Sequence, residues 1–451
     1  MQLPSFDVEF TRSGEVFSAP QVDALLAAVP GLTDLFVVSH GWNNDMADAR
    51  RLYDALFRSI SDILDIGDGV VPGLANRRLG VLRVFWPSKK FTDEELIPGG
   101  GAASATKEND AALIQQLEAL KTDPERLGGH DRNPVREVAL TQAQQLVPKL
   151  ETDASARREY VMLLRSILNP ADAHADDGSE EFFSRDAEEL FDGLKGNVVA
   201  PGATSGGGVT SVHGAPGAAS GGAAGLKDLL EGVKAAARRL ANFTTYYAMK
   251  ERAGLVGRAG LAPVLQRVRD RKSDIRLHLI GHSFGGRLVT AAANTLPPNT
   301  PRVTLSLLQA AFSHNGLAEK FDEKRDGAFR SIIAQKRVSG PIIITHTKND
   351  KAVGIAYPLA SRISRDQAAA LGDANDPYGG MGRNGAQRMK PGECVFGDLL
   401  AVGKQYALAP GKVFNLKADA FIADHGSVTG VQVAYAILNA ARVADDAVAL
   451  T

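Results

Sequence analysis

Residues 281–286 read Gly-His-Ser-Phe-Gly-Gly and place a serine between glycines. A serine hydroxyl can attack a carbonyl carbon when a neighbouring base removes its proton. The spacing G-x-S-x-G is typical of such a serine when a strand precedes it and a helix follows, because the sharp turn between them exposes the hydroxyl. Ser283 is therefore our candidate nucleophile.

The residues on both sides of this serine fit that turn. Residues 275–280 alternate apolar and polar side chains and predict a strand, and residues 287–293 predict the first turns of a helix. Gly281 and Gly285 would let the strand and the helix approach each other closely. The N–H of Phe284, the residue after the serine, could then stabilise the negative charge that develops on a carbonyl oxygen under attack.

A second turn with a glycine follows the apolar run 35–38, which predicts a buried parallel strand. Residues 39–42 of this turn are Ser-His-Gly-Trp. Gly41 would let the backbone approach a bound group, and the N–H of Trp42 could be a second donor to the same oxygen. The alternative is an ordinary turn between a strand and a helix.

A serine nucleophile needs a base, and a histidine base needs a carboxylate that fixes its tautomer. Asp350 follows the predicted strand 341–345, and His425 follows the last predicted strand, 413–416. Because ligands on parallel sheets bind at the carboxyl ends of the strands, both side chains could meet Ser283 there. We assign the base to His425 and its partner to Asp350.

Other residues compete for these two roles. The rival bases adjoin the nucleophile or follow other predicted strands: His282, His314 and His346. His282 adjoins the nucleophile, but we expect its side chain to point away from it. Asp424 is the rival carboxylate, although side chains of adjacent residues such as Asp424 and His425 rarely face each other.

The composition excludes several classes of protein. The 451 residues include 51 Lys and Arg against 52 Asp and Glu, a formal net charge of −1. This balance argues against binding of nucleic acid and against attachment to anionic lipid by bulk charge. The single cysteine, Cys394, excludes an intramolecular disulfide and a cysteine metal cluster, and we expect its thiol to be unreactive. We expect no cofactor and no metal, and the oligomeric state stays open.

The sequence also bears on location. The first residues lack the basic and apolar segments of a secretion signal, and no apolar run approaches the ~18 residues of a membrane span. We expect no transmembrane segment and take the cytoplasm as the default compartment. Export by a route that needs no signal peptide would leave no trace in the sequence.

Predicted strands and helices alternate, which favours an α/β protein with a mostly parallel central sheet and helices on both faces. We expect its core to comprise residues 1–88 and 226–451. Residues 89–225 form a helical insertion, in which the Gly- and Ala-rich stretch 193–225 should be a flexible loop. The insertion could be a cap over the site, or a helical subdomain with no gating role.

Two further stretches of the sequence predict local structure. The charged residues 319–330 predict a surface helix, and residues 372–397 predict a loop. Within that loop Gly380, Gly382 and Gly385 match a dinucleotide-binding fingerprint by spacing alone. Since no predicted strand precedes them, we treat the match as chance.

These motifs resemble those of the α/β-hydrolase superfamily of serine hydrolases. The turn 281–285, the His-Gly-Trp of residues 40–42 and the order Ser, Asp, His along the chain match its pattern. Residues 84–88 together with 40–44 also resemble a poorly characterised bacterial branch of hydrolase-like proteins. The resemblance covers roughly residues 30–90 and 225–440 and leaves out the insertion.

The resemblance implies an α/β-hydrolase fold and a metal-independent serine hydrolase. Ser283 would attack, His425 would carry the proton and Asp350 would orient it, with the N–H groups of Phe284 and Trp42 as the oxyanion hole. A carboxylic ester is the expected small-molecule substrate, and with the proposed cap it could be a lipid ester, although amide cleavage uses the same parts. The alternatives are a catalytically silent, hydrolase-like binding protein and a secreted antibacterial lipase effector.

Overall fold

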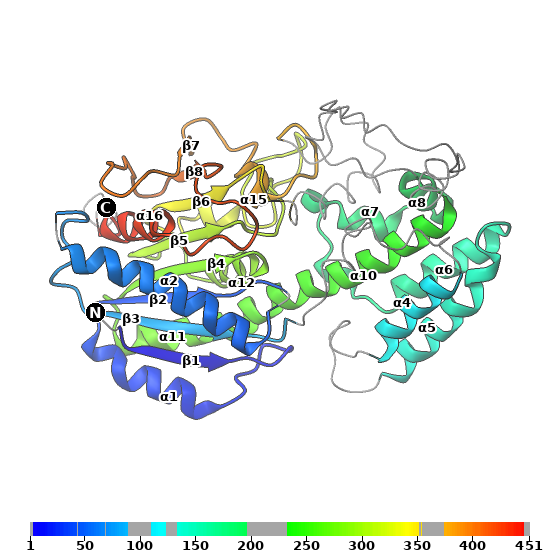
Figure 1. The fold of residues 1–451 in the computed structure, drawn as a ribbon, viewed down its shortest axis with the longest axis horizontal. Coiled ribbons are helices and arrows are strands. Elements are labelled where there is room, and N and C mark those ends of the chain that lie inside the picture. Colours follow the sequence, from blue (N-terminus) through cyan, green and yellow to red (C-terminus); the bar gives the residue numbers. More distant parts are fainter. Residues whose placement is uncertain are drawn as a thin grey trace, which may run out of the picture.

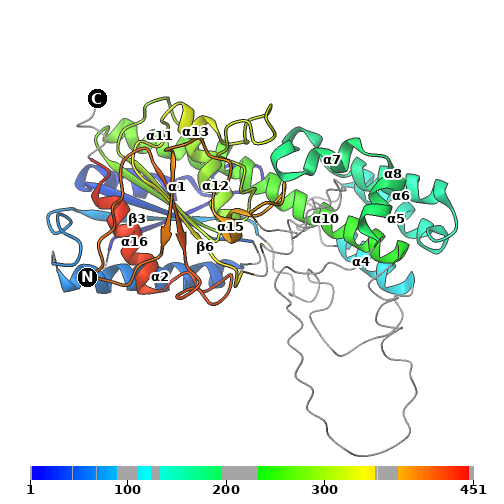
Figure 2. The same cartoon turned by 90° about the horizontal axis from the view of Figure 1, so that it is seen from above.

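The computed structural model describes most of the chain: residues 3–42, 44–67, 69–88, 110–122, 133–195, 232–350, 353 and 374–445. Figures 1 and 2 show two lobes, a sheet covered by helices and a smaller lobe of helices alone. The long helix α10 (Val233–Leu255) runs from one lobe into the other. None of the described helices is long and apolar enough to cross a membrane.

The larger lobe contains one sheet, in which every described strand runs parallel to its neighbours, in the order β1-β3-β2-β4-β5-β6-β8-β7. All carboxyl ends therefore lie on one edge, where ligands bind on sheets of this kind. The strands are β1 (Ser5–Glu9), β2 (Asp34–Ser39), β3 (Leu79–Phe85), β4 (Arg276–His282), β5 (Val303–Leu308), β6 (Ile342–His346), β7 (Cys394–Asp398) and β8 (Val413–Lys417). The α/β class predicted from the sequence is confirmed.

Helices cover both faces of this sheet. The helices α1 (Ala19–Ala28), α11 (Ala262–Arg271) and α12 (Phe284–Ala293) pack on one face, and α2 (Met46–Ile66) and α16 (Val431–Arg442) pack on the other. Apolar residues at helical spacing explain the packing of α2, which buries Tyr53, Leu56, Ile60 and Ile63. The shorter elements are α13 (Ser331–Ala334), α15 (Met381–Asn384), the 3₁₀ turn η1 (Val29–Gly31) and the π-helical turn η5 (Val256–Leu261).

The smaller lobe has its own apolar core, built from the described part of the insertion and the first half of α10. From α10, Leu240 and Phe243 are buried in this core, whereas Met249 and Ala253 are buried in the core of the sheet lobe. One continuous helix therefore belongs to both lobes. The other elements are α4 (Asp110–Thr122), α5 (Pro134–Leu146), α6 (Ala154–Ser166), α7 (Ser179–Ser184), α8 (Ala187–Leu194), η2 (Val147–Lys149) and η3 (Pro170–Asp172). The turn η4 (Ala175–Asp177) packs against Ala318 and Phe321 of the sheet lobe.

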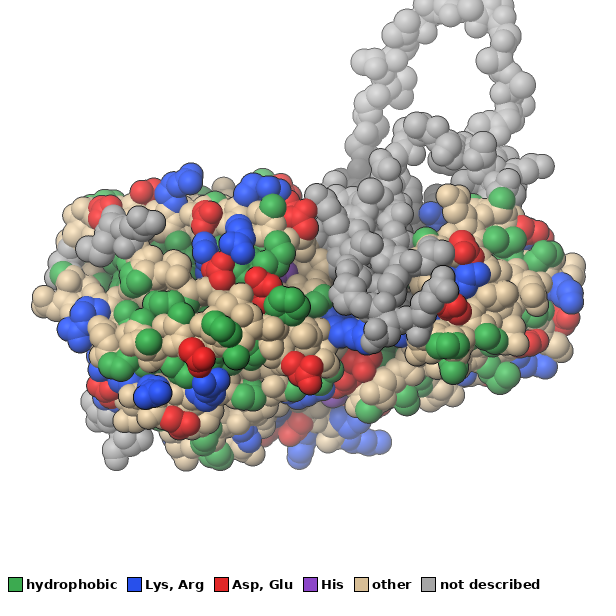
Figure 3. All heavy atoms as spheres, turned by 90° about the horizontal axis from the view of Figure 1, so that it is seen from below, with side chains coloured by type: hydrophobic (Ala, Val, Ile, Leu, Met, Phe, Trp, Pro, Cys, Tyr) green, Lys and Arg blue, Asp and Glu red, His purple; other side chains and the backbone are tan. Residues whose placement is uncertain are grey.

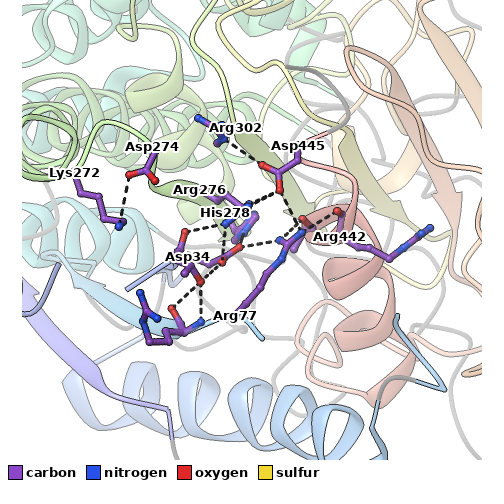
Figure 4. Close-up of polar contacts among 12 residues, drawn as sticks. Asp34, Arg77, Lys272, Asp274, Arg276, His278, Arg302, Arg442 and Asp445 are labelled. Atoms are coloured by element: carbon purple, nitrogen blue, oxygen red, sulfur yellow. Dashed lines mark hydrogen bonds and ion pairs between the residues drawn. The ribbon is translucent and has the colours of Figure 1, made fainter. Parts of the chain in front are cut away.

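A polar network closes the amino-terminal edge of the sheet (Figure 4). Asp34 at the start of β2 is bound by His278 Nε2 at 2.9 Å and by Arg77 Nη1 at 2.9 Å. Asp445, just after α16, is bound by Arg276 Nε at 2.8 Å and by Arg302 Nε at 3.2 Å. The end of the described chain is thus tied to the first residues of the central strands, on the edge opposite their carboxyl ends.

Charged side chains of both signs are interspersed on the face shown in Figure 3, without a continuous patch of either sign. This agrees with the nearly equal numbers of acidic and basic residues in the sequence.

Three local expectations have different outcomes. The surface helix expected at 319–330 is wrong: this segment is a series of turns, with φ of 48° at Lys320 and 69° at Glu323. The Asp322 carboxylate accepts from the N–H of Arg325 at 2.7 Å, and such local side-chain bonds compete with helix formation. The loop expected at 372–397 omitted the short helix α15 and the start of β7. Of the stretch 193–225, residues 196–225 lie outside the described part of the chain.

Candidate active site

Ser283 occupies a sharp turn between β4 and α12. Its φ of 56° and ψ of −125° lie where residues other than glycine are rare. Its backbone is held at both ends, because its N–H donates to the Leu308 carbonyl at 3.1 Å and its own carbonyl accepts from Gly286 and Ala311 at 3.0 and 2.9 Å. Such strained conformations persist only where surrounding contacts enforce them, and they cluster at functional sites.

The glycines around Ser283 are required by close contacts. A Cβ on Gly281 would lie 2.4 Å from the carbonyl oxygen of Gly285. A Cβ on Gly285 would lie 2.3 Å from the carbonyl oxygen of Ser39 at the end of β2. Any side chain at either position would push α12 away from the strands, so these glycines allow the helix to begin directly beside Ser283.

The loop after β2 touches Ser283. A Cβ on Gly41 would lie 2.4 Å from the Cβ and 3.0 Å from the Oγ of Ser283. The Trp42 ring packs edge-on against the Phe284 ring, with centroids 5.8 Å apart. The N–H of Phe284 is the first of α12, where N–H groups have no partner within the helix and attract negative charge. Both loops proposed to supply donors therefore lie beside the serine hydroxyl.

His40, the first residue after β2, is held in place by hydrogen bonds of its backbone and by stacking of its ring. Its N–H donates to the hydroxyl of Tyr53 at 2.8 Å, and its carbonyl accepts from the Trp86 indole at 3.0 Å. The His40 ring stacks on the Trp86 ring with centroids 5.6 Å apart. Burial lowers the pKa of His40 to about 4, so the ring stays neutral and has a supporting role.

Asp350 and His425 form a hydrogen-bonded pair. Asp350 Oδ2 lies 2.8 Å from His425 Nδ1. Asp350 is fully buried, and its other oxygen accepts from the N–H of Val353 at 2.9 Å. The His425 side chain is 24% exposed, and its Nε2 makes no hydrogen bond within the described part of the chain. That nitrogen is the one a base would use.

His282 links this pair to the nucleophile. Its Nε2 lies 2.8 Å from the carbonyl oxygen of His425, and the two ring centroids are 4.9 Å apart. His425 is thus in contact with the residue next to Ser283. Within the described residues the Ser283 hydroxyl and the His425 ring form no hydrogen bond, as is common in active sites without substrate.

The rival residues lie in other environments. Asp424 accepts from the N–H groups of Gly426 and Ser427, both at 2.9 Å, and shapes its own turn. His314 receives the N–H of Gly379 on Nε2 at 3.2 Å, and burial lowers its pKa to about 3. Burial also lowers the pKa of His346. None of these contacts joins a rival to Ser283.

The sequence analysis did not single out Gln309, which borders this site. Gln309 follows β5 with φ of 46°, and its Nε2 lies 3.5 Å from Asp350 Oδ2. Its position at the carboxyl end of a strand, where ligands bind on parallel sheets, was the available signal. From α10, the ring of Tyr246 lies 5.4 Å from the ring of Phe284, so the helical lobe reaches the first residue of α12.

Comparisons with known proteins gave no match for this chain. No family model, no curated protein and no solved structure matches it. Among the described residues, no group of three or more His, Cys, Asp and Glu could hold a metal ion. Burial raises the pKa of the Cys394 thiol to about 11, so it stays protonated near neutral pH.

Proposed function

We propose that this protein is a serine hydrolase of the α/β-hydrolase type that cleaves a carboxylic ester through an acyl-enzyme. The observation that carries the proposal is the contact chain from Ser283, strained at the end of β4, through His282 to His425 and Asp350. The order Ser, Asp, His along the chain and the strand–turn–helix context support the assignment to this fold family.

The proposed reaction has two halves, formation of the acyl-enzyme and its hydrolysis, and the same groups act in both. Asp350 accepts the Nδ1–H of His425, which leaves Nε2 as the base. Nε2 takes the hydroxyl proton as Ser283 Oγ attacks the ester carbonyl, and the N–H groups of Phe284 and Trp42 stabilise the oxyanion. His425 then protonates the departing alkoxide. Water, deprotonated by His425, attacks the acyl-enzyme and releases the acid and the serine.

The neighbourhood of the hydroxyl supports an apolar acyl group. Trp42 and Tyr246 are partly buried rings that contact Phe284 from the loop after β2 and from α10. An acyl chain beside Ser283 would meet aromatic carbon on these two sides, which favours esters of fatty or other apolar acids. The helical lobe would then act as part of the acyl site.

Covalent labelling with a fluorophosphonate probe tests the proposal. The wild type should be labelled, and Ser283→Ala and His425→Ala should not. Ser166→Ala is the matched control, because the Ser166 hydroxyl bonds only its own helix, at the carbonyl of Leu163, and lies in the helical lobe. Hydrolysis of p-nitrophenyl esters of rising chain length then tests the acyl preference.

Absence of labelling in the folded wild type would overturn the proposal and favour a binding protein without turnover. Labelling that survives Ser283→Ala would place the reactive residue elsewhere.

A further inference from the structure

His282 makes a contact whose direction can be assigned. Its ring is 6% exposed, and its Nε2 lies 2.8 Å from the carbonyl oxygen of His425. A carbonyl oxygen can only accept, so Nε2 carries the hydrogen and donates it. The side chain next to the candidate nucleophile thus holds the backbone of the candidate base.

The second ring nitrogen makes a histidine unfavourable at this position. Nδ1 of His282 is buried and has no hydrogen-bond partner among the described residues. An unpaired buried polar atom is unfavourable, and an apolar ring of similar size would avoid that penalty. The donation from Nε2 is what an apolar ring could not supply.

The ring is also suited to remain neutral beside a base. Burial, and then the positive charge that His425 would carry, lower the pKa of His282 to about 3. A neutral imidazole has a single N–H, and here the His425 carbonyl accepts it. His282 therefore adds no charge that would oppose protonation of His425.

His425 has few other supports. Within the described part of the chain, its hydrogen bonds to other segments are two: the ring bonds Asp350 and the backbone bonds His282. The turn around it is shaped from inside by Asp424, which accepts from Gly426 and Ser427. The position of the imidazole relative to Ser283 thus depends on these two bonds.

We propose that His282 is a positioning residue: its Nε2–H holds the carbonyl of His425 so that the imidazole, fixed at Nδ1 by Asp350, aims Nε2 at Ser283. This inference rests on the proposed function, since the position of His425 affects a rate only if His425 is the base. A small displacement of a base from its productive geometry is sufficient to lower a rate by about 10²-fold.

Three substitutions separate the donor from the shape of the ring. In His282→Gln the side-chain amide nitrogen can take the place of Nε2, whereas in His282→Asn the shorter chain places it near Nδ1. His282→Phe keeps a ring without a donor. We would measure kcat, KM and the pH profile with p-nitrophenyl butyrate, with active sites counted by fluorophosphonate titration, and the melting temperature of each variant.

We expect His282→Gln to keep kcat per active site within about threefold of the wild type. His282→Asn and His282→Phe should lower kcat by about 10- to 100-fold with little change in KM. The acid limb of their kcat/KM profiles should move to lower pH, because a displaced His425 loses part of its contact with Asp350.

The outcomes are distinguishable from a failure of the proposed function. A wild type that is not labelled refutes both. A labelled wild type, with Asn and Phe variants that melt lower but keep kcat per active site, would show a purely structural histidine and overturn the inference. If His282→Phe does not fold, equal rates for the Gln and Asn variants would overturn it as well.

Discussion

Nδ1 of His425 lies 2.8 Å from Oδ2 of Asp350, although 75 residues separate them along the chain. The two residues follow β8 and β6, which pair side by side in the sheet. The carboxyl group is fully buried, whereas the imidazole is partly exposed. A buried carboxylate that faces one nitrogen fixes the tautomer and leaves the other nitrogen available on the open side.

Asp350→Asn should lower kcat by about 10²- to 10⁴-fold, because an amide cannot hold the same tautomer or stabilise the imidazolium. Hydrolysis of p-nitrophenyl butyrate measures this loss. Asp424→Asn is the matched control, since Asp424 adjoins His425 but bonds only its own turn. A larger loss in the Asp424 variant would reverse the assignment of the carboxylate.

Gly41→Ala should reduce kcat/KM by about 10²-fold, the loss expected when an oxyanion donor is displaced. The added Cβ would lie 2.4 Å from the Cβ of Ser283, so the loop after β2 must move away from the hydroxyl. Gly31→Ala is the control, because no atom lies within 4 Å of the Cβ it would add. Full activity in the Gly41 variant would exclude this loop from the oxyanion site.

How much of this structure could be read from the sequence depends on how local each feature is. Residues 342–346 form β6, within one residue of the predicted strand 341–345, because a buried parallel strand is a largely continuous apolar run. The α/β class follows from the alternation of such runs with amphipathic helices. The roles of Ser283, Asp350 and His425 stay predictions, although the structure gathers them.

The predictions that were wrong or missing concern features without a periodic pattern in the sequence. Residues 319–330 are charged and contain no proline, yet Asp322 binds N–H groups of the chain ahead of it and turns the backbone. The strand β7 is mostly exposed, so no apolar run marks it. The contact from His282 to the His425 carbonyl depends on a loop 143 residues away, which no local pattern reports.

Lys250→Met should lower the free energy of unfolding by about 3–5 kcal/mol, the loss typical of a broken buried ion pair. Lys250 is buried in α10, where its Nζ pairs with Asp177 and bonds the Ser179 hydroxyl at 2.9 Å. The substitution would leave the Asp177 carboxylate buried without this cation. Urea unfolding, followed by tryptophan fluorescence, measures the change.

The control is another lysine of the same helix. Lys234 pairs with Asp110 at 2.7 Å with a partly exposed side chain, and such pairs contribute about 0–1 kcal/mol. Lys234→Met should therefore be almost neutral. Similar losses in the two variants would mean that the Lys250 pair is not dehydrated as its burial indicates.

Acid should destabilise the fold well above the pH at which carboxylates protonate. Burial lowers the pKa of His40 to about 4, and that of His282 and His314 to about 3, from the ordinary 6.5. At pH values between the lowered pKa of each histidine and 6.5, the unfolded chain binds more protons than the folded chain. The free energy of unfolding therefore falls as the pH drops below about 6.5.

Asp176 acts in the opposite direction. Burial and the neighbouring Asp177 raise its pKa to about 6, so the folded chain gains a proton that the unfolded chain takes up only near 3.8. This one group stabilises the fold as the pH falls from about 6 to about 4, but the buried histidines with lowered pKa values oppose it. For Asp34, burial raises the pKa, but its bonds to His278 and its other partners outweigh this and lower it to about 2, so it matters only below 3.8.

Urea unfolding between pH 7.5 and 4.5 should therefore show a steady loss of stability, with a slope of about 1.4 kcal/mol per pH unit for each net proton taken up on unfolding. His314→Gln removes one of these protons, and because no hydrogen bond among the described residues joins the His314 ring to the candidate site, labelling of Ser283 should survive. The slope near pH 5 should fall by about one proton. A stability that is constant from pH 7.5 to 5 would show that the buried histidines are protonated in the fold at no penalty, and would contradict the lowered pKa values.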